Sequence, residues 1–197
     1  MTPRLLQGRA PAAFTMAGLF MLAQVAFIGL TRLGIGALSE MHAAASGLMA
    51  VFASLWALGG LHPRLSPGSP RLAKAMVVLV SIAALMMLTA IVLLLVSRAG
   101  DPGPMAALPP RVLGVIGGFL IAYVLSFALA AMGSMKADSK VVAGLLLVPV
   151  ICWGAIIIVG ALGAGPEALK LDLYLNAVMA ISFLGLGAAL KSKPGSK

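Results

Sequence analysis

The sequence predicts an all-α membrane protein: a single domain, residues 1–197, in which six transmembrane helices form a bundle and both termini face the cytoplasm. Three observations support this fold class: an apolar composition, six long uncharged segments, and an uneven distribution of lysine and arginine. Of the 197 residues, 61% are hydrophobic and 10% are charged, and the mean hydropathy is +1.11. A soluble domain carries about a quarter charged residues, so this chain has too few polar groups to cover itself in water. A lipid-facing exterior needs no such cover.

Six segments contain no Asp, Glu, Lys or Arg, and they are 18 to 26 residues long. About 20 helical residues span the ~30 Å hydrocarbon core, so even the shortest segment is a candidate span. The segments do not alternate in polarity as barrel strands do, and a helix satisfies its own backbone in lipid. In order, the predicted spans are Ala10–Thr31, Met41–Pro63, Ala75–Ser97, Val112–Met135, Val141–Pro166 and Leu173–Leu190.

The first span has a competing interpretation. Arg4 and Arg9 precede an apolar run, as they would in a secretory signal peptide. The apolar core of a signal peptide has about 7–15 residues, and this run is longer, so we favour a retained span. Its removal would also leave the new N-terminus on the wrong side for the remaining charges.

The connections are short and rich in residues that end helices. Residues 62–70, between the second and third spans, include three prolines and a glycine. Residues 98–104, together with Pro109 and Pro110, separate the third span from the fourth. Proline cannot continue a helix, and glycine permits a turn. No connection is long enough to hold a separate soluble domain.

The basic residues gather on one side of the predicted bundle. If successive connections alternate sides, one side carries ten Lys and Arg residues with one acid, Asp138, and the other carries four basic and four acidic residues. Short loops rich in Lys and Arg stay in the cytoplasm, so the first side is predicted to be cytoplasmic, in a bacterial inner membrane. The ten basic residues are Arg4, Arg9, Arg64, Arg71, Lys74, Lys136, Lys140, Lys191, Lys193 and Lys197. The net charge of +9 thus has a topological cause and does not require nucleic-acid binding.

The predicted spans lack the ionisable groups that most membrane chemistry needs. No Asp, Glu, Lys or Arg lies within them, which argues against proton-coupled transport and against an intramembrane acid–base enzyme. We therefore predict no enzyme and no catalytic residues. The single cysteine, Cys152, excludes an intrachain disulfide and a cysteine-based zinc cluster.

The two histidines are weak candidates for a haem or pigment site. His42 and His62 lie 20 residues apart on one predicted helix, or about 30 Å. They cannot ligate the same iron, and we predict no cofactor. A single-ligand site on one of them stays open, although we favour the interpretation that both are interfacial histidines at helix ends.

Three aromatic residues lie near the middle of their spans, although Trp and Tyr normally gather at the membrane interfaces. These are Trp56, Tyr123 and Trp153, and the uncharged polar residues at similar depth are Gln24, Ser54, Thr89, Ser126 and Cys152. If their side chains converge, they form a neutral pocket for an uncharged or lipid-like ligand. The alternative is that they bridge helices and fill the core.

Small residues at four-residue spacing predict close helix packing on two spans. The second span carries Ala43 and Gly47 in one row and Ser46, Ala50 and Ser54 in another, and the fourth carries Gly114, Gly118 and Ala122. Such faces pack within the chain, against a membrane-protein partner or in a homo-oligomer. In the fifth span, Pro149 leaves one backbone carbonyl without its helical partner, and a hydroxyl from a neighbouring helix is expected to meet it.

Three functions are compatible with these features. The first is a non-catalytic membrane subunit that packs within a larger assembly, because buried charge and reactive clusters are missing from the spans. The second is a carrier or channel for a small neutral or amphipathic solute, using the midplane aromatic residues. The third is a haem- or pigment-binding membrane protein.

Overall fold

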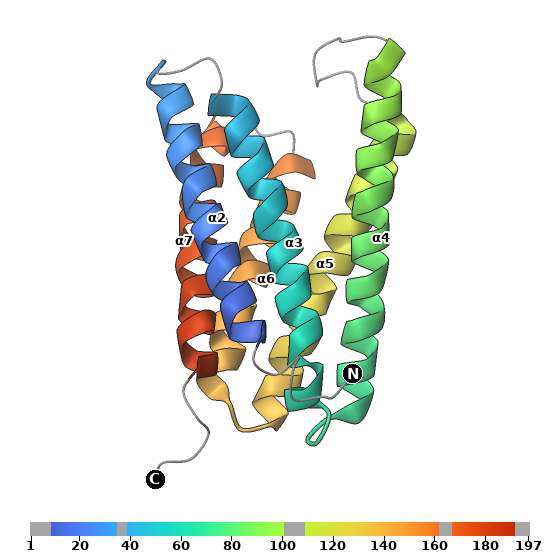
Figure 1. Cartoon of the computed structure of the whole chain (residues 1–197), viewed down its shortest axis with the longest axis vertical. Helices are drawn as coiled ribbons and strands as arrows, with labels where there is room; N and C mark the ends of the chain where they lie inside the picture. Colours follow the sequence, from blue (N-terminus) through green and yellow to red (C-terminus); the bar gives the residue numbers. More distant parts are fainter. Residues whose placement is uncertain (1–8, 35–38, 101–108, 162–166, 192–197) are drawn as a thin grey trace.

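A computed structural model describes residues 9–34, 39–100, 109–161 and 167–191, and within these ranges the chain is helical and contains no strand (Figure 1). Six of its helices are long and apolar enough to cross a membrane, which confirms the predicted fold class. With the labels of Figure 1, they are α2 (Arg9–Arg32), α3 (Ser39–Leu65), α4 (Pro70–Gly100), α5 (Pro110–Lys136), α6 (Lys140–Ala161) and α7 (Glu167–Lys191). The protein is therefore an integral membrane protein.

The helices extend beyond the uncharged segments at most of their ends. Helix α4 begins five residues before its predicted span, and α7 begins at Glu167, six residues before Leu173. The last helix therefore has 25 residues, more than the 18 expected from its uncharged part. Helix α6 ends at Ala161, and the predicted continuation to Pro166 lies outside the described residues. A charge limits the part of a helix that lipid tolerates, but it does not end the helix.

The six helices form a closed ring. Each helix contacts the next one along the chain, and α2 contacts α7, which closes the ring. Helix α3 also contacts α5 across the bundle. In Figure 1, α3 and α4 lie close together at one end of the bundle and diverge toward the other.

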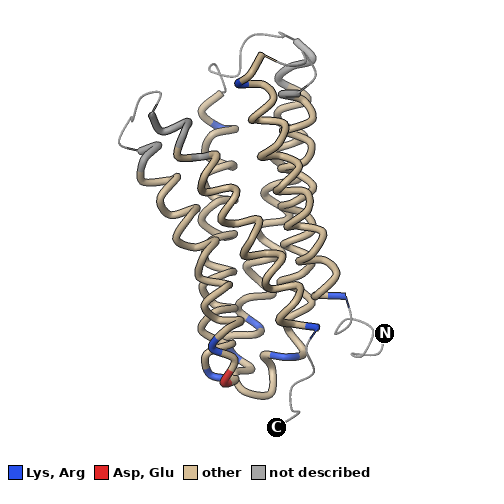
Figure 2. The backbone as a smooth tube through the Cα atoms, turned by 90° about the vertical axis from the view of Figure 1, so that its left-hand side faces the viewer, with Lys and Arg blue, Asp and Glu red and all other residues tan. Residues whose placement is uncertain are grey.

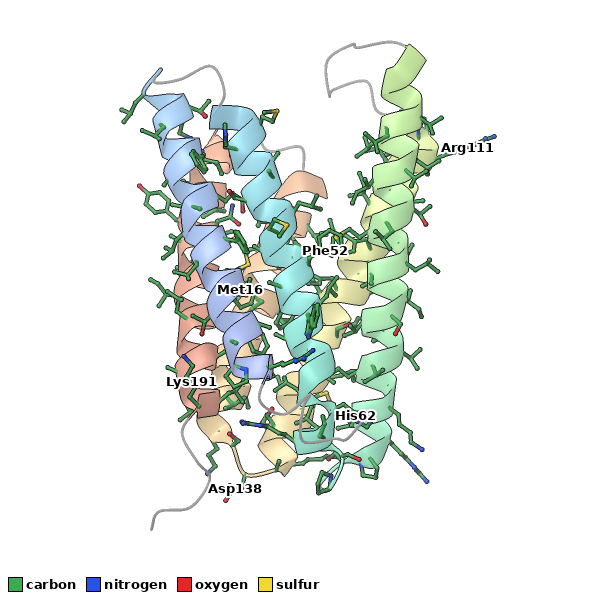
Figure 3. The ribbon with its side chains drawn as sticks, in the orientation of Figure 1. Met16, Phe52, His62, Arg111, Asp138 and Lys191 are labelled. Carbon is green, nitrogen blue, oxygen red and sulfur yellow. The ribbon has the colours of Figure 1, made fainter. Side chains whose placement is uncertain are left out.

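The described cations concentrate at one end of the bundle, called the basic end below (Figure 2). The helix boundaries place the starts of α2, α4 and α6 and the ends of α3, α5 and α7 at this end (Figure 1). Figure 3 shows Lys191 and Asp138 there and Arg111 toward the opposite end. Among the side chains that the structure describes, the basic end holds Arg9, Arg64, Arg71, Lys74, Lys136, Lys140 and Lys191, whereas the opposite end holds Arg32 and Arg111.

Arg64 has a structural role at the basic end. Its guanidinium donates a hydrogen bond to the backbone carbonyl of Leu190, at 2.8 Å. That carbonyl belongs to the last turn of α7, where carbonyl groups have no helical partner. Arg64 therefore joins the end of α3 to the end of α7.

The turn between α5 and α6 ends α5 with a Schellman motif. The amide of Ser139 donates to the carbonyl of Ser134, and the amide of Asp138 donates to that of Met135. Asp138, between the two helices, adopts the left-handed conformation at which the chain changes direction, with a φ of 57°. This conformation is usually taken by glycine. The turn brings α6 back antiparallel to α5 without a longer loop.

Helix α2 packs closely on α7 through two glycines that the sequence analysis did not single out. A methyl group at Gly18 would lie 2.7 Å from Cγ of Leu184 and 3.0 Å from the carbonyl oxygen of Ala180. A methyl group at Gly187 would meet Thr15 and the carbonyl oxygen of Pro11. Backbones approach this closely only where the side chain is a hydrogen atom.

The carbonyl freed by Pro149 has the partner that the sequence predicted. Proline at position 149 has no N–H to donate to the carbonyl of Leu145, four residues earlier. The hydroxyl of Ser182 on α7 donates to that carbonyl at 2.6 Å. The expectation of a hydroxyl from a neighbouring helix is confirmed, and the bond joins α6 to α7.

Candidate ligand-binding site

The centre of the bundle is occupied by packed aromatic rings around Tyr123. This residue on α5 is fully buried. Its ring is stacked on Phe119, at a centroid distance of 5.4 Å, and meets Phe127 and Trp153 edge-on, at 5.1 and 6.1 Å. Such geometries are favoured for aromatic pairs and stabilise the core beyond the area they bury.

The aromatic contacts continue across the ring of helices. Phe127 stacks on Phe183 of α7 at 5.8 Å, and Phe183 contacts Phe14 of α2 at 6.1 Å. Aromatic rings thus connect α6, α5, α7 and α2 in one continuous row. The sequence analysis considered only Trp and Tyr and therefore missed the phenylalanines.

The hydroxyl of Tyr123 is hydrogen-bonded to Ser54 of α3 at 2.6 Å, and both residues are fully buried. Ser54 Oγ also donates to the carbonyl of Val51 at 2.8 Å. A serine hydroxyl has a single proton, so both hydroxyl protons find an acceptor when Tyr123 donates to Ser54 and Ser54 donates to Val51. This pair joins α5 to α3 and leaves Tyr123 as a core residue with its polar group satisfied.

A cavity of about 390 Å³ lies beside the aromatic row and is called the central cavity below. All six of the helices above contribute to its walls. Its volume falls within the range of about 300–1,000 Å³ that is typical of ligand pockets. It is lined by Met21, Gln24, Ala44, Gly47, Leu48, Val51, Met87, Ala90, Ile91, Leu94, Ile116, Phe119, Trp153 and Asn176. None of these side chains carries a charge.

Three neutral polar side chains line the central cavity: Gln24, Asn176 and Trp153. The indole nitrogen of Trp153 is buried and has no hydrogen-bond partner, and it is the one such buried side-chain atom in the described part of the chain. Gln24 lies against Gly47, where a methyl group would be 2.6 Å from the amide nitrogen of Gln24. Gly47 therefore makes room for a polar side chain on the wall of the cavity.

The structure brings only some of the predicted pocket residues together. Gln24 and Trp153 line the central cavity, and Tyr123 and Ser54 pair beside it. Ser126 is buried, and its hydroxyl donates to the carbonyl of Ala122 on its own helix, at 2.7 Å. Two other predicted residues, Trp56 and Thr89, lie away from the central cavity.

Trp56 and Thr89 do not join the predicted midplane pocket. Trp56 is 59% exposed, and Thr89 is exposed and donates to the carbonyl of Leu85 on its own helix, at 2.9 Å. For Trp56 the reason is helix geometry. Residues two apart point about 200° apart on a helix, so Trp56 faces outward because Ser54 faces inward.

Asn176 is a cavity residue that the sequence analysis missed. It lies in α7, is 4% exposed and is the only asparagine in the chain. It stands near the start of the 18-residue uncharged segment, where a polar residue is ordinary at the interface. The longer α7 places it well inside the helix. A lone amide in an apolar helix was the available signal.

The small residues predicted to pack have different environments. Ala43, Ala50 and Ala122 are buried, and a methyl group at Gly118 would meet Met86 of α4. Gly114, in contrast, has no atom within 4 Å of a methyl group placed there. No contact within the described chain uses it.

The two histidines lie near opposite ends of α3. His42 is exposed and packs against Phe27, with a ring-centroid distance of 5.3 Å, and His62 is half-buried. The described residues contain no group of three or more His, Cys, Asp or Glu side chains placed to hold a metal ion. Cys152 is buried.

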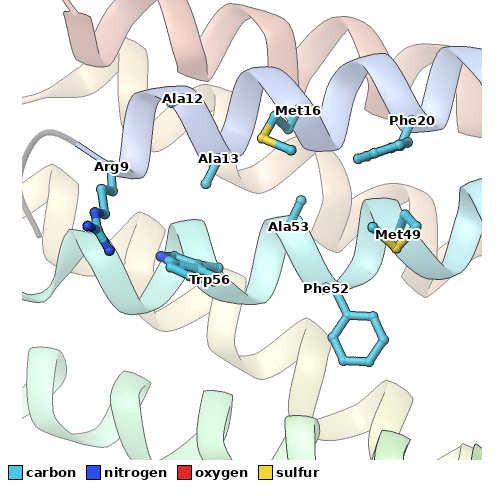
Figure 4. Close-up of a pocket in the computed structure, with 9 residues that line it drawn as sticks. All are labelled: Arg9, Ala12, Ala13, Met16, Phe20, Met49, Phe52, Ala53 and Trp56. Atoms are coloured by element: carbon cyan, nitrogen blue, oxygen red, sulfur yellow. The ribbon is translucent and has the colours of Figure 1, made fainter.

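A second cavity, of about 680 Å³, lies between α2 and α3 and is called the α2–α3 groove below (Figure 4). It is lined by Arg9, Ala12, Ala13, Met16, Phe20, Met49, Phe52, Ala53 and Trp56. It contains Trp56, the predicted aromatic residue that lies away from both the central cavity and the aromatic row.

Comparison of the chain with protein-family models, with curated proteins and with solved structures found no match.

Proposed function

We propose that the protein binds a small uncharged solute in the central cavity and acts as a carrier or channel for it. The observation that carries this proposal is a cavity with neutral polar lining, in which one lining residue, Trp153, has a buried indole N–H without a partner in the protein. An unsatisfied buried donor costs about 1–3 kcal/mol. A ligand acceptor that reaches this N–H after a small rotation of the indole would remove that cost, so the site would favour such a ligand over a pure hydrocarbon.

The lining defines the class of ligand. The polar side chains of the lining, Gln24, Asn176 and Trp153, are uncharged, and the remaining wall is apolar. A charged ligand would be desolvated without a counter-charge, which is strongly unfavourable. The proposed ligand is therefore neutral and amphipathic, with a carbonyl or a similar acceptor next to an alkyl or ring portion.

The divergence of α3 and α4 supports an entry route. Both helices line the central cavity, and they separate toward the end opposite the basic end (Figure 1). Ala44 and Leu48 line the cavity from α3 and are exposed. A solute would enter between these two helices without displacing the aromatic row.

The binding of 2-octanone tests this proposal, because the ketone is uncharged and carries one acceptor on an apolar chain. Calorimetry on protein in lipid nanodiscs should show saturable binding that weakens about tenfold in Trp153→Phe, which removes the indole donor. Trp56→Phe is the matched control and should bind like the unchanged protein. Octanoate, a charged molecule of similar size, should not compete.

A second variant guards against loss of folding in Trp153→Phe. Gln24→Leu removes another polar group of the cavity and leaves the aromatic row intact. It should also weaken binding of 2-octanone. Equal affinities in all variants, or competition by octanoate, would contradict a neutral binding site in the central cavity.

We also propose that the basic end faces the cytoplasm, with both termini on that side, in a bacterial inner membrane. Seven described cations at this end against two at the other support it. Short cytoplasmic loops retain Lys and Arg, whereas exported loops do not.

A second candidate function, a non-catalytic subunit of a membrane assembly or a homo-oligomer, is favoured by the outward glycines of α5. Gly114 and Gly117 face open space, with no atom within 4 Å of a methyl group at either position. They leave backbone accessible to a helix of a partner. Gly114→Leu should then reduce co-purification of that partner in mild detergent, whereas Gly144→Leu, at an equally open position on α6, should not. Recovery of the unchanged protein as a lone monomer would contradict this function.

A further inference from the structure

We propose that the α2–α3 groove binds one anionic phospholipid, with the headgroup phosphate at Arg9 and an acyl chain along the groove. This inference is independent of the solute proposed for the central cavity, because the two cavities share no lining residue. It rests on the groove's lining, its length and its position.

The lining is apolar except at one end. Figure 4 shows Arg9 at one end of the groove and Phe20 and Met49 toward the other. All other lining side chains are uncharged, and no acid lines the groove. An occupant that matches this wall has a long apolar part and an anionic group at one end only.

The length of the groove matches one leaflet of a bilayer. Eleven residues separate Arg9 from Phe20 on α2, which corresponds to about 16 Å of helix. Half of the ~30 Å hydrocarbon core is about 15 Å. The groove therefore runs from the headgroup level at the basic end to the middle of the membrane, which is the depth of one acyl chain.

Arg9 is suited to a phosphate. It is exposed at the start of α2, at the basic end, where headgroups lie. A guanidinium pairs with phosphate oxygens through two parallel hydrogen bonds. Its charge also favours a lipid with net negative charge over a zwitterionic one, because the zwitterion brings its own cation.

Trp56 adds a second polar contact next to Arg9. Its ring is 59% exposed, and its indole nitrogen lies at the end of the ring nearest Arg9 (Figure 4). Next to Arg9 it lies closer to the interface than the sequence predicted, and Trp is enriched at interfaces because its ring is apolar and its N–H is polar. In the groove, the N–H would donate to an ester carbonyl below the phosphate.

The outward exposure of the groove favours a lipid over an internal ligand. Met16 and Met49, from the two walls, are about half exposed, at 50% and 46%. They face the lipid side of two apolar helices. A lipid from the surrounding leaflet reaches this site by lateral diffusion and needs no opening of the bundle.

Fluorescence quenching in nanodiscs tests the proposal. In Trp153→Phe, Trp56 is the only tryptophan and reports on the groove alone. Brominated phosphatidylglycerol should quench it with about fivefold higher affinity than brominated phosphatidylcholine, since one cation near a membrane contributes about 1 kcal/mol. Adding Arg9→Gln should abolish this preference while leaving quenching by both lipids. Lys140→Gln, at the same end but outside the groove, should retain it.

Each alternative gives a different result. Equal quenching by the two lipids in the unchanged groove, or the same preference in Arg9→Gln, would overturn the proposal. Loss of the preference in Lys140→Gln as well would assign it to the general charge of the basic end and would also overturn it. Absence of quenching by either lipid would show that no acyl chain occupies the groove and would also overturn the proposal. Arg9→Lys, which keeps the charge, should preserve a reduced preference.

Discussion

At the scale of single residues, the buried hydroxyls of Ser54 and Tyr123 show how polar groups inside this bundle are satisfied by hydrogen bonds. Tyr123 donates to Ser54, and Ser54 donates to the carbonyl of Val51, so both protons are used. The chain of donors ends on a backbone oxygen of the same helix. No proton points to the central cavity, which agrees with a structural role for Tyr123.

The direction of this chain predicts unequal effects of the two deletions. In Ser54→Ala, the buried Tyr123 hydroxyl loses its acceptor, which should lower the free energy of unfolding by about 1–3 kcal/mol. In Tyr123→Phe, Ser54 keeps its bond to Val51, and the loss should be only about 0.6 kcal/mol, the average for such pairs in membranes. Reversible unfolding in mixed micelles measures both. A larger loss in Tyr123→Phe would mean that the donor direction is reversed.

At the scale of helices, the sequence predicted each element and its approximate ends but not the direction its side chains face. Charges and breakers delimit spans because lipid excludes them, whereas the rotation of a helix depends on neighbours that are far away in sequence. Ser54 and Trp56 lie at the same depth of α3, yet one is buried in the core and the other lines the outer groove. The packing of α2 and α5 against α3 determines which of the two side chains is buried and which is exposed.

The pair formed by Pro149 and Ser182 yields a prediction about two helices. Ser182→Ala leaves the carbonyl of Leu145 without a donor and should cost about 1 kcal/mol of unfolding free energy. In a Pro149→Ala background, the restored amide at position 149 donates to that carbonyl, so the same serine substitution should cost close to nothing. A double-mutant cycle in micelles measures the difference. Equal costs in both backgrounds would show that the Ser182 hydroxyl does not serve this carbonyl.

Two glycines with opposite surroundings test the packing of α2 on α7. Gly18→Ala places a methyl group 2.7 Å from Leu184 and should destabilise the protein by about 1–3 kcal/mol through overpacking. Gly114→Ala meets open space and should stabilise α5 by about 0.5–1 kcal/mol, because alanine favours a helix more than glycine does. Thermal unfolding of the two variants measures the contrast. Equal midpoints would contradict the close contact at Gly18.

At the scale of the whole molecule, the ring of helices explains why the candidate site could be predicted only in part. The central cavity draws on all six helices, so its composition depends on the order in which they surround it. The sequence identified Gln24 and Trp153 as polar or aromatic residues at midplane depth, because depth follows from position within a span. It did not identify Asn176, which lies near the start of the uncharged segment but well inside the longer α7.

The orientation of the whole molecule in the membrane can be tested without altering any charge. In a Cys152→Ser background, a cysteine at Ala137 reports on the basic end, and a cysteine at Leu33 reports on the opposite end; both positions are exposed. If the cationic loops are retained in the cytoplasm, a membrane-impermeant maleimide should label Leu33→Cys in intact cells and Ala137→Cys only in inverted vesicles. Labelling of both positions from the same side would contradict the bundle itself, because α2 has 24 residues and therefore separates the two ends by about 36 Å. The reversed pattern would keep the bundle and place the phospholipid proposed for the α2–α3 groove in the outer leaflet.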